Sequence, residues 1–450
     1  MSLKLEDTIA AIATPPGRSA LSVIRMSGPA AFEIGRKHIR PWPARARTAY
    51  LSGVLSEELL LDEALVILFP GPDSFTGEDT LEISAHGGYV VPASILAVLI
   101  SSGARQATGG EFTRRAVLNG KLDLLQAEAI GDLIDAQSRG MQETALAQLD
   151  GGLSRRLLGL RENLLDLEAL LAYDIDFPEE DDGPIASEKI EVATATLIDS
   201  IRSLLATAPA GELIREGAVV VIAGPPNAGK SSLFNALLGR SRAIVTEIPG
   251  TTRDALEAVI DNGKFPLRIV DTAGLRDSVD PIERLGIEVS ERYLAAAHVI
   301  LACAETREEL DRTSLKIAER SAAPVIPVRT KIDLVANDDQ LACRTEIGVS
   351  APNGTGLSRL LAAIEDIVET SYGEVPVDLP ILTRARHFRA LSLALEEIEA
   401  FRQGWVESNL PVSIASVHLR AAVHALEELV GAVDVEDVLD RVFSSFCVGK

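Results

Sequence analysis

The chain has 450 residues, of which 47% are apolar, and its formal net charge is −23. This length predicts about three domains, and the apolar share is that of an ordinary globular protein. The strong acidity excludes a protein that coats nucleic acid or an anionic membrane without specificity.

The acidity is concentrated in one segment. Residues 1–121 carry twelve basic and twelve acidic side chains, whereas residues 122–213 carry six and nineteen. A nucleic-acid partner could therefore still dock outside the acidic segment.

The cysteines and the N-terminal residues bear on where the protein works. Cys303, Cys343 and Cys447 form no C-x-x-C pair, so neither a zinc site nor a disulfide framework is expected. The first residues lack the basic-then-apolar order of a signal peptide. No apolar run reaches the roughly 18 residues that span a bilayer. We expect a cytoplasmic protein without a membrane partner.

Four segments with different periodicity follow one another along the chain. Residues 1–120 mix short β-like runs with helical stretches and Gly/Pro turns, which predicts an α+β domain. Residues 121–213 carry apolar side chains at i, i+3, i+4 and i+7, the pattern of amphipathic helices. Residues 214–375 alternate Val/Ile-rich runs with helical patterns, which predicts a doubly wound parallel sheet. Amphipathic helices resume over residues 376–450. The expected fold class is an α+β multidomain protein whose α/β domain is inserted into an α-helical one.

The run GPPNAGKSS, which begins at Gly224, follows a predicted strand and precedes a predicted helix. It fits the P-loop pattern G-x-x-x-x-G-K-[ST] in its required strand–loop–helix context. Gly224 and Gly229 permit the tight turns that aim backbone N–H groups at phosphate oxygens, and the helix N-terminus adds its dipole. Lys230 would reach the β- and γ-phosphates, and Ser231 would offer its hydroxyl to Mg²⁺.

The nucleotide base is predicted from the run TKID, which begins at Thr330 after another β-like run. The carboxylate of Asp333 can accept two N–H groups of guanine, which adenine cannot match, and the stem of Lys331 would cover the base. Thr330 replaces the asparagine usual in GTPases and loses its amide. In the later run VSAP, the backbone N–H of Ala351 would bind guanine O6, and Pro352 stands where lysine is usual. In this order after a P-loop, the set favours GTP.

Two further runs complete the expected phosphate site. IVDTAGLR places Asp271 near Mg²⁺ and gives the Gly274 amide to the γ-phosphate, and TEIPGTTRD offers Thr252 as a Mg²⁺ ligand. Ras-like proteins carry a water-orienting glutamine directly after this DTAG, where this chain has Leu275. Hydrolysis must therefore take that help from elsewhere.

Together with ATPPGRSALSVIRMSGP near the start and FCVGK at the end, these motifs resemble the MnmE/TrmE family of tRNA-modification GTPases, from Asp7 to Lys450. The resemblance implies a homodimer that joins an FAD-binding partner, MnmG/GidA, as a heterotetramer. The two would place an aminomethyl or carboxymethylaminomethyl group on carbon five of the wobble uridine of certain tRNAs, with a tetrahydrofolate as one-carbon donor. Which tRNAs are modified, and whether glycine or ammonia supplies the nitrogen, stay open.

The resemblance also implies a site for 5-formyl- or methylene-tetrahydrofolate. Its contacts fall on Arg25, Glu82, Lys121 and Lys450, because cations suit the glutamate tail of a folate and a carboxylate suits its pterin donors. By residue type alone, the same charges would be ordinary solvated side chains. Cys447 would take part in the modification as nucleophile or acid/base, or else pack as a small apolar side chain.

For hydrolysis the resemblance implies K⁺ at the phosphates, where its charge would replace that of an arginine finger. The expected K⁺ ligands are Asn227, Thr246, Ile248 and Thr251. Glu283 would orient the attacking water or lie as an ordinary surface charge, and Arg276 would act as a secondary switch residue.

The expected nucleotide site combines all of these runs. The residues expected to contact GTP are Asn227, Ala228, Gly229, Lys230, Ser231, Ser232, Thr246, Glu247, Ile248, Pro249, Gly250, Thr251, Thr252, Asp271, Thr272, Ala273, Gly274, Thr330, Lys331, Asp333, Ser350, Ala351 and Pro352. The rival interpretation is a regulatory or ribosome-assembly GTPase switch without covalent tRNA chemistry, because a fold does not fix a function.

Overall fold

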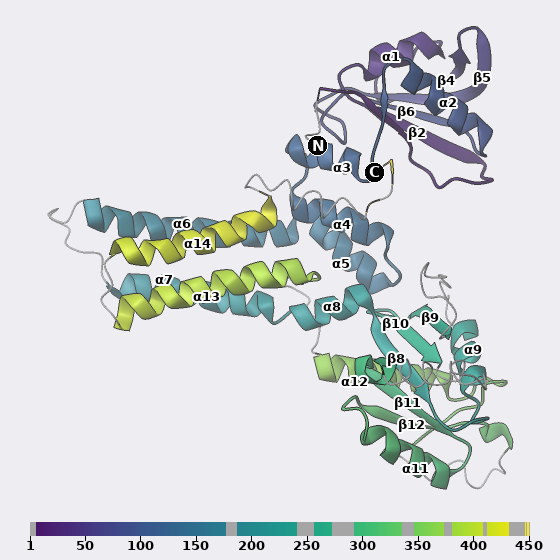
Figure 1. Cartoon of the computed structure of the whole chain (residues 1–450), viewed down its shortest axis with the longest axis vertical. Coiled ribbons are helices and arrows are strands. Elements are labelled where there is room, and N and C mark those ends of the chain that lie inside the picture. The colour runs from purple at the N-terminus through teal and green to yellow at the C-terminus, as the bar shows by residue number, and fades with distance from the viewer. Residues whose placement is uncertain are drawn as a thin grey trace, which may run out of the picture. The chain divides into compact units, whose positions relative to one another are not determined.

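The structure is a computed structural model that describes residues 6–176, 187–240, 256–271, 292–334, 346–372, 380–407, 412–431, 446 and 448–449 (Figure 1). The chain divides into two compact units. The first comprises residues 1–131 and 427–450, and the second comprises residues 132–426.

The first unit contains a seven-stranded sheet with the strand order β3-β4-β5-β6-β2-β1-β7. Its neighbouring strands are antiparallel, except that β1 and β7 are parallel. The elements are β1 (Ile9–Ile12), β2 (Leu21–Ser27), α1 (Ala31–His38), β3 (Ile39–Arg40), β4 (Tyr50–Ser56), β5 (Leu59–Phe69), β6 (Thr80–His86), α2 (Val90–Ser101), β7 (Arg105–Gln106), α3 (Glu111–Leu118) and α4 (Leu124–Ile134), of which α4 runs on into the second unit.

Alternation along the strands decides which side chains meet the core and which are left for a site. Ile24 and Met26 of β2 pack in one apolar cluster with Ile34 of α1 and Ile95 of α2. Because successive side chains of a strand point to opposite faces, Arg25 between them points away from this core. The sheet register pairs it with Glu82 of β6, which alternates in the same way.

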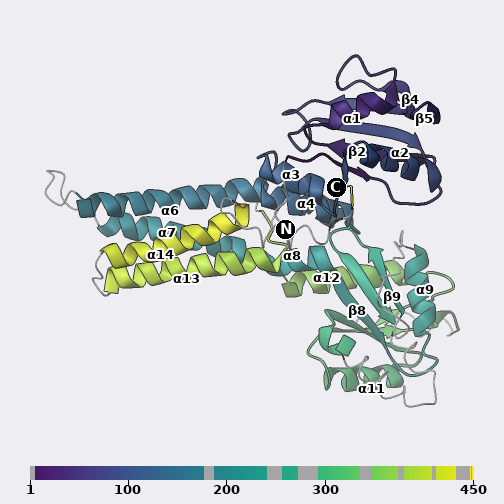
Figure 2. The same ribbon diagram turned by 45° about the horizontal axis from the view of Figure 1, so that its top comes forward.

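Helices α6 (Gly152–Asp176), α7 (Ser187–Leu205), α13 (Ala385–Glu407) and α14 (Val412–Val430) run side by side in Figures 1 and 2. An ion pair of 2.6 Å joins Arg202 of α7 to Glu399 of α13, and one of 2.5 Å joins Arg420 of α14 to Glu168 of α6. The elements are α5 (Arg139–Leu149), α6 (Gly152–Asp176), α7 (Ser187–Leu205), α8 (Ala208–Glu216), α13 (Ala385–Glu407) and α14 (Val412–Val430), of which α14 ends in the first unit.

The second unit also holds a six-stranded sheet with the order β13-β12-β11-β8-β10-β9. The neighbouring pairs are parallel apart from β9, which lies antiparallel to β10 at one edge and so differs from the all-parallel sheet expected. An antiparallel edge strand is a common variation in such sheets. The elements are β8 (Ala218–Ala223), α9 (Lys230–Arg240), β9 (Leu256–Asp261), β10 (Pro266–Asp271), β11 (Val299–Ala304), α11 (Arg307–Ala318), β12 (Val325–Arg329), η2 (Ile332–Leu334), β13 (Ile347–Gly348) and α12 (Leu357–Tyr372).

The central strands of this sheet are buried on both faces, as expected where helices cover both sides. Every residue of β8 and of β11 is buried, and the apolar side chains form separate clusters on the two faces. Burial on both faces explains why AVVVIA (β8) and VILACA (β11) are continuous apolar runs. Because the two strands are parallel, the loops that follow them lie at the same edge of the sheet.

The chain segments before and after this sheet lie against each other. The Leu382 amide donates to the Thr207 hydroxyl over 3.1 Å, and the Gln148 side-chain amide donates to the Ile381 carbonyl over 3.0 Å. A Cβ on Gly211 would lie 2.0 Å from the Leu382 carbonyl oxygen, so only glycine permits this approach. Among the described residues, no helix combines the length and the apolar character needed to cross a bilayer.

Candidate functional site

The first candidate site is the loop between β8 and α9. Asn227 and Gly229 have φ angles of +62° and +77°, and such left-handed residues turn successive amides of a loop toward an anion. A Cβ on Gly224 would lie 2.2 Å from the Cys303 carbonyl oxygen, so glycine lets the loop run against β11. The predicted P-loop glycines thus have distinct steric roles.

Lys230 lies over this loop. Its ammonium donates to the carbonyls of Gly224 at 3.1 Å and Pro225 at 2.8 Å, and only 7% of the residue is exposed. The cation is therefore positioned at the loop where a P-loop receives its phosphates. Ser231, the expected Mg²⁺ ligand, follows it directly at the start of α9 and is exposed.

The predicted base-binding run contacts the P-loop. Thr330 donates its hydroxyl to the Ala228 carbonyl at 2.8 Å and is also 3.2 Å from the Ala304 carbonyl. Lys331 donates to the Asn227 carbonyl at 2.9 Å. The hydroxyl of Thr330 therefore joins the predicted base-binding run to the P-loop, although Thr330 lacks the amide of the usual asparagine.

The second base-binding run lies beside the first. The Ile332 amide donates to the Val349 carbonyl over 3.4 Å, and the Val349 amide donates to the Arg329 carbonyl over 2.8 Å. This pairing brings Ala351 and its neighbours Ser350 and Pro352 into the loop adjacent to Asp333, which is exposed. The structure thus assembles the P-loop and both predicted base loops at one edge of the sheet.

Asp271 ends β10 and is fully buried beside β8. The pKa of the nearby Cys303 thiol is raised to about 12, chiefly by burial. The negative charge of Asp271 raises this pKa further, and the positive charge of Lys230 lowers it. Asp271 thus ends its strand in the interior, close enough to Cys303 and Lys230 for all three to influence one another's charge.

Part of the predicted nucleotide site lies outside the described residues. These positions are Thr246, Glu247, Ile248, Pro249, Gly250, Thr251, Thr252, Thr272, Ala273, Gly274, Arg276 and Glu283. The K⁺ ligands other than Asn227, and the groups expected to orient water, therefore stay predictions. Within the described ranges, no cluster of three or more His, Cys, Asp or Glu side chains could hold a metal ion.

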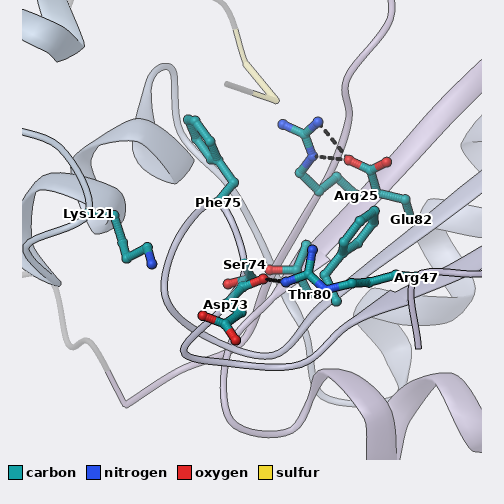
Figure 3. A pocket seen from close by; sticks show the side chains of 9 residues that line it. Arg25, Arg47, Asp73, Ser74, Phe75, Thr80, Glu82 and Lys121 are labelled. Atoms are coloured by element: carbon teal, nitrogen blue, oxygen red, sulfur yellow. Dashed lines mark hydrogen bonds and ion pairs between the residues drawn. The ribbon is translucent and has the colours of Figure 1, made fainter. Parts of the chain in front are cut away.

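The second candidate site is a cavity of about 570 Å³ in the first unit (Figure 3). Arg25 and Glu82 stand on its wall because their strands pair them in register. The Arg25 Nε is 2.8 Å and its Nη2 2.7 Å from the same Glu82 oxygen. The lining residues are Arg25, Arg47, Phe69, Asp73, Ser74, Phe75, Thr80, Glu82 and Lys121.

The end of the chain reaches the same wall. Val448 forms an antiparallel bridge with Gly109, and Arg25 donates to the Gly449 carbonyl over 3.4 Å. Gly449 has a φ of +98°, and a Cβ there would lie 2.7 Å from the Ala13 Cα. The tail is therefore held beside a predicted folate contact, although Cys447 and Lys450 themselves lie outside the described residues.

A buried ionic network holds the loop that supplies Asp73, Ser74 and Phe75. Arg115, 2% exposed, donates to Glu78 at 3.1 Å and to Asp7 at 2.5 Å. Glu78 also accepts from the Ser27 hydroxyl at 2.7 Å. Glu111, 1% exposed, lies 3.2 Å from Arg115 and completes the network.

The network lowers the pKa values of its carboxyl groups. Burial has the largest single effect on the pKa of Glu111 and would raise it, but the hydrogen bonds from Arg105 and the Thr108 amide, with the charges of Arg105 and Arg115, lower it overall. The pKa of Asp7 is lowered in the same way: burial opposes, and Arg105 and Arg115 prevail.

Sequence reasoning found three lining residues of this cavity, Arg25, Glu82 and Lys121. It missed Arg47 and the loop residues because their chain neighbours carry no recognisable motif. The available signal was the run PGPDSFTGED after Phe69, which is too rich in turn residues for a tight hairpin and separates two strands that pair.

The P-loop, with the base loops that brace it, defines a P-loop nucleotide-binding protein of the GTPase class. A family model described as "GTP-binding protein TrmE N-terminus" matches residues 8–121, and one described as "MnmE helical domain" matches residues 124–447. The proteins named "tRNA modification GTPase MnmE" include one from Heliobacterium modesticaldum, 41% identical over 99% of both chains. Another, from Aquifex aeolicus, is 39% identical over 99% of this chain and 100% of its own. The chain therefore belongs to the MnmE family of tRNA modification GTPases, as its motifs predicted.

Among solved structures, the G domain of the T. maritima FeoB iron transporter is 26% identical to part of this chain. The match covers 33% of this chain and 98% of the transporter domain, with a TM-score of 0.26. So low a TM-score supports no argument about this fold.

Proposed function

We propose that this chain is a K⁺-stimulated GTP hydrolase that acts with an FAD-binding MnmG/GidA partner on tRNA. The pair modifies carbon five of the wobble uridine to an aminomethyl or carboxymethylaminomethyl form, with a tetrahydrofolate as one-carbon donor. The chain works as a homodimer, and its working parts are residues 1–120, 121–213, 214–375 and 376–450. The observation that carries the proposal is the assembly of the P-loop and both base loops in a chain that also holds a charged cavity.

The GTP side of the proposal rests on charges and donors at one edge of the sheet. Lys230 neutralises the phosphates, and Ser231 with Thr252 holds Mg²⁺, whose charge stabilises the leaving phosphate. Asp333 selects guanine by accepting two N–H groups. Asp271 orients the magnesium ligands from its buried position at the end of β10.

The K⁺ side of the proposal rests on Asn227. This residue turns the P-loop with a positive φ, and its side chain is exposed there. It holds K⁺ together with Thr246, Ile248 and Thr251, and Glu283 orients the attacking water, with Arg276 as a secondary switch residue. Leu275 has no polar side-chain group and cannot orient the attacking water, as a glutamine does in Ras-like proteins. In this proposal the K⁺ ligands and Glu283 take over that function.

The folate side of the proposal rests on the cavity in the first unit. Its volume of about 570 Å³ falls in the usual range for ligand pockets. Phe75, 41% exposed, offers an aromatic surface, Glu82 can accept pterin N–H groups, and Lys121 can meet a carboxylate. Lys450 is the remaining folate contact in this proposal, and Cys447 takes part in the modification.

A reconstitution tests the proposal directly. Purified protein is incubated with its flavoprotein partner, FAD, NADH, methylene-tetrahydrofolate, GTP and unmodified tRNA, in KCl or in NaCl, and nucleosides and phosphate release are measured. We expect modified uridine and faster hydrolysis in KCl. Equal rates in the two salts would remove the K⁺ assignment. Normal hydrolysis with unmodified uridine would favour the regulatory switch instead.

The base assignment has its own test. Asp333→Asn exchanges an acceptor for a donor, so the variant is expected to prefer xanthosine triphosphate, whose ring carries an acceptor where guanine carries a donor. Competition of the wild-type protein by ATP as strong as by GTP would contradict the assignment.

A further inference from the structure

Two cations of the cavity in Figure 3 have no carboxylate partner among the described residues. Arg25 is paired with Glu82. Arg47, by contrast, donates its Nη2 to the backbone carbonyl of Asp73, which carries no net charge. The amide of Lys121 donates to the Ala116 carbonyl over 2.8 Å, but its ammonium has neither a hydrogen bond nor an ion pair within the part of the chain that the structure describes, and it lies across the view from Arg25.

The Arg47 side chain is fixed in the cavity by neutral groups. Its backbone has a φ of +55°, in a region that residues other than glycine seldom adopt, and its amide donates to the Leu68 carbonyl over 2.8 Å. Its guanidinium carbon lies 5.9 Å from the centre of the Phe69 ring. The carbonyl and the ring orient this exposed guanidinium, and it forms no ion pair with a described carboxylate, although the Asp73 side chain lines the same cavity.

An oriented guanidinium without an ion-pair partner is suited to a carboxylate. Its planar N–H groups match the two oxygens of a carboxylate, and the single contact with Asp73 leaves other N–H groups for a ligand. Lys121 offers a second cation without that geometry. A ligand with two separate anionic groups would give each of them a partner.

We propose that Arg47 recognises one carboxylate of the glutamate tail of the ligand in this cavity, and that Lys121 receives the other. Arg25, which is already neutralised by Glu82, then faces the uncharged part of the ligand. This assignment rests on the proposed folate site and makes it more specific: Arg47 distinguishes a folate with free tail carboxylates from one without them.

Calorimetry on the full chain tests the assignment with two probes, 5-formyl-tetrahydrofolate and its dimethyl ester, whose tail carboxylates are capped. Arg47→Gln is expected to weaken binding of the free acid by roughly ten- to hundredfold, the usual range for a charged hydrogen bond. It should leave binding of the ester within about twofold of wild type. Arg47→Lys keeps the charge but loses the planar fork, so it should retain part of the preference for the free acid.

Arg45→Gln is the matched control, because Arg45 is exposed two residues away and does not line the cavity. It removes the same long-range charge and should change neither affinity. Equal loss of both probes in Arg47→Gln would mean that Arg47 only supports the loop, and an unchanged affinity for the free acid would also overturn the assignment. Wild-type protein that binds neither probe would instead overturn the folate site itself.

Discussion

The hydroxyl of Thr330 donates a hydrogen bond to the backbone carbonyl of Ala228, with 2.8 Å between the oxygens. The two residues are 102 positions apart in the sequence, and the bond joins the base loop to the P-loop. It is buried, since 3% of Thr330 and 3% of Ala228 is exposed. The predicted base loop and the P-loop are therefore held together by a buried contact.

Thr330→Val should loosen this joint. Valine has nearly the same shape but no hydroxyl, so the Ala228 carbonyl loses a buried donor at a cost of about 1–3 kcal/mol. We expect a fluorescent GDP analogue to bind roughly tenfold more weakly in a stopped-flow or titration measurement. Thr330→Ser retains the hydroxyl and should bind like wild type. Equal affinities of the valine variant and wild type would show that the hydrogen bond does not position the loop.

Local pattern predicted those features that depend on neighbours in sequence. The P-loop turns follow from Gly224 and Gly229, and the alternation of β2 is local too, since it turns Arg25 away from the core that α1 and α2 cover. Contacts between segments that are distant in the sequence could not be predicted from local pattern. The pairing of Arg25 with Glu82 depends on the register of two strands, and the family resemblance named both residues as folate contacts without pairing them.

The remaining features depend on tertiary packing. Arg47 enters the cavity because a loop between β3 and β4 folds against the loop after β5, and no periodicity encodes that approach. The sequence showed only that Thr330 lacks the amide of the usual asparagine. It did not show that the Ala228 carbonyl lies within reach of the threonine hydroxyl. The antiparallel direction of β9 likewise depends on how the chain returns to the edge of the sheet. The pattern of apolar and polar side chains does not determine that direction.

Gly449→Ala should detach the tail from the first unit. The φ of +98° strains any residue with a Cβ, and the new methyl group would meet the Ala13 Cα at 2.7 Å. A cost of about 1–3 kcal/mol is expected from the backbone strain alone. We expect calorimetry to show binding of 5-formyl-tetrahydrofolate weakened to the level of a chain that ends at residue 446.

Val448→Ala provides the control for the tail, because Val448 is half-exposed and its backbone makes the bridge to Gly109. Its folate affinity should stay within about twofold of wild type, as is usual for a surface substitution. GTP hydrolysis should be unaffected in both variants. Full folate affinity in Gly449→Ala would separate the tail from the site.

Cys303 should resist alkylation in the folded protein. Complete burial raises the pKa of its thiol to about 12, and the thiolate is the reactive form. At pH 8 about one molecule in ten thousand would carry the thiolate. In a Cys343→Ser/Cys447→Ser background, iodoacetamide followed by mass spectrometry should label Cys303 only after denaturation. Labelling of the native protein at the rate of a free thiol would contradict its burial.

Glu111→Gln should destabilise the first unit at neutral pH and make its stability depend less on pH. The pKa values of Glu111 and Asp7 lie below their unfolded values of about 4, so their ionised forms stabilise the fold above that pH and the contribution is lost as the pH falls. Removing the buried carboxylate also leaves Arg115 short of a partner, at a cost of about 3 kcal/mol at neutral pH.

Urea unfolding followed by the fluorescence of Trp42, in a Trp405→Phe background, isolates the first unit because the chain has two tryptophans. We expect Glu111→Gln to lower the unfolding midpoint at pH 7 and to flatten its decline between about pH 5 and pH 3, since one of the titrating groups is gone. Glu33→Gln removes an equal charge from an exposed pair with Lys37 and should shift the midpoint little. If the two variants decline alike with pH, the buried network does not set the acid limit, and the loop that carries Phe75 must be held by its backbone contacts instead.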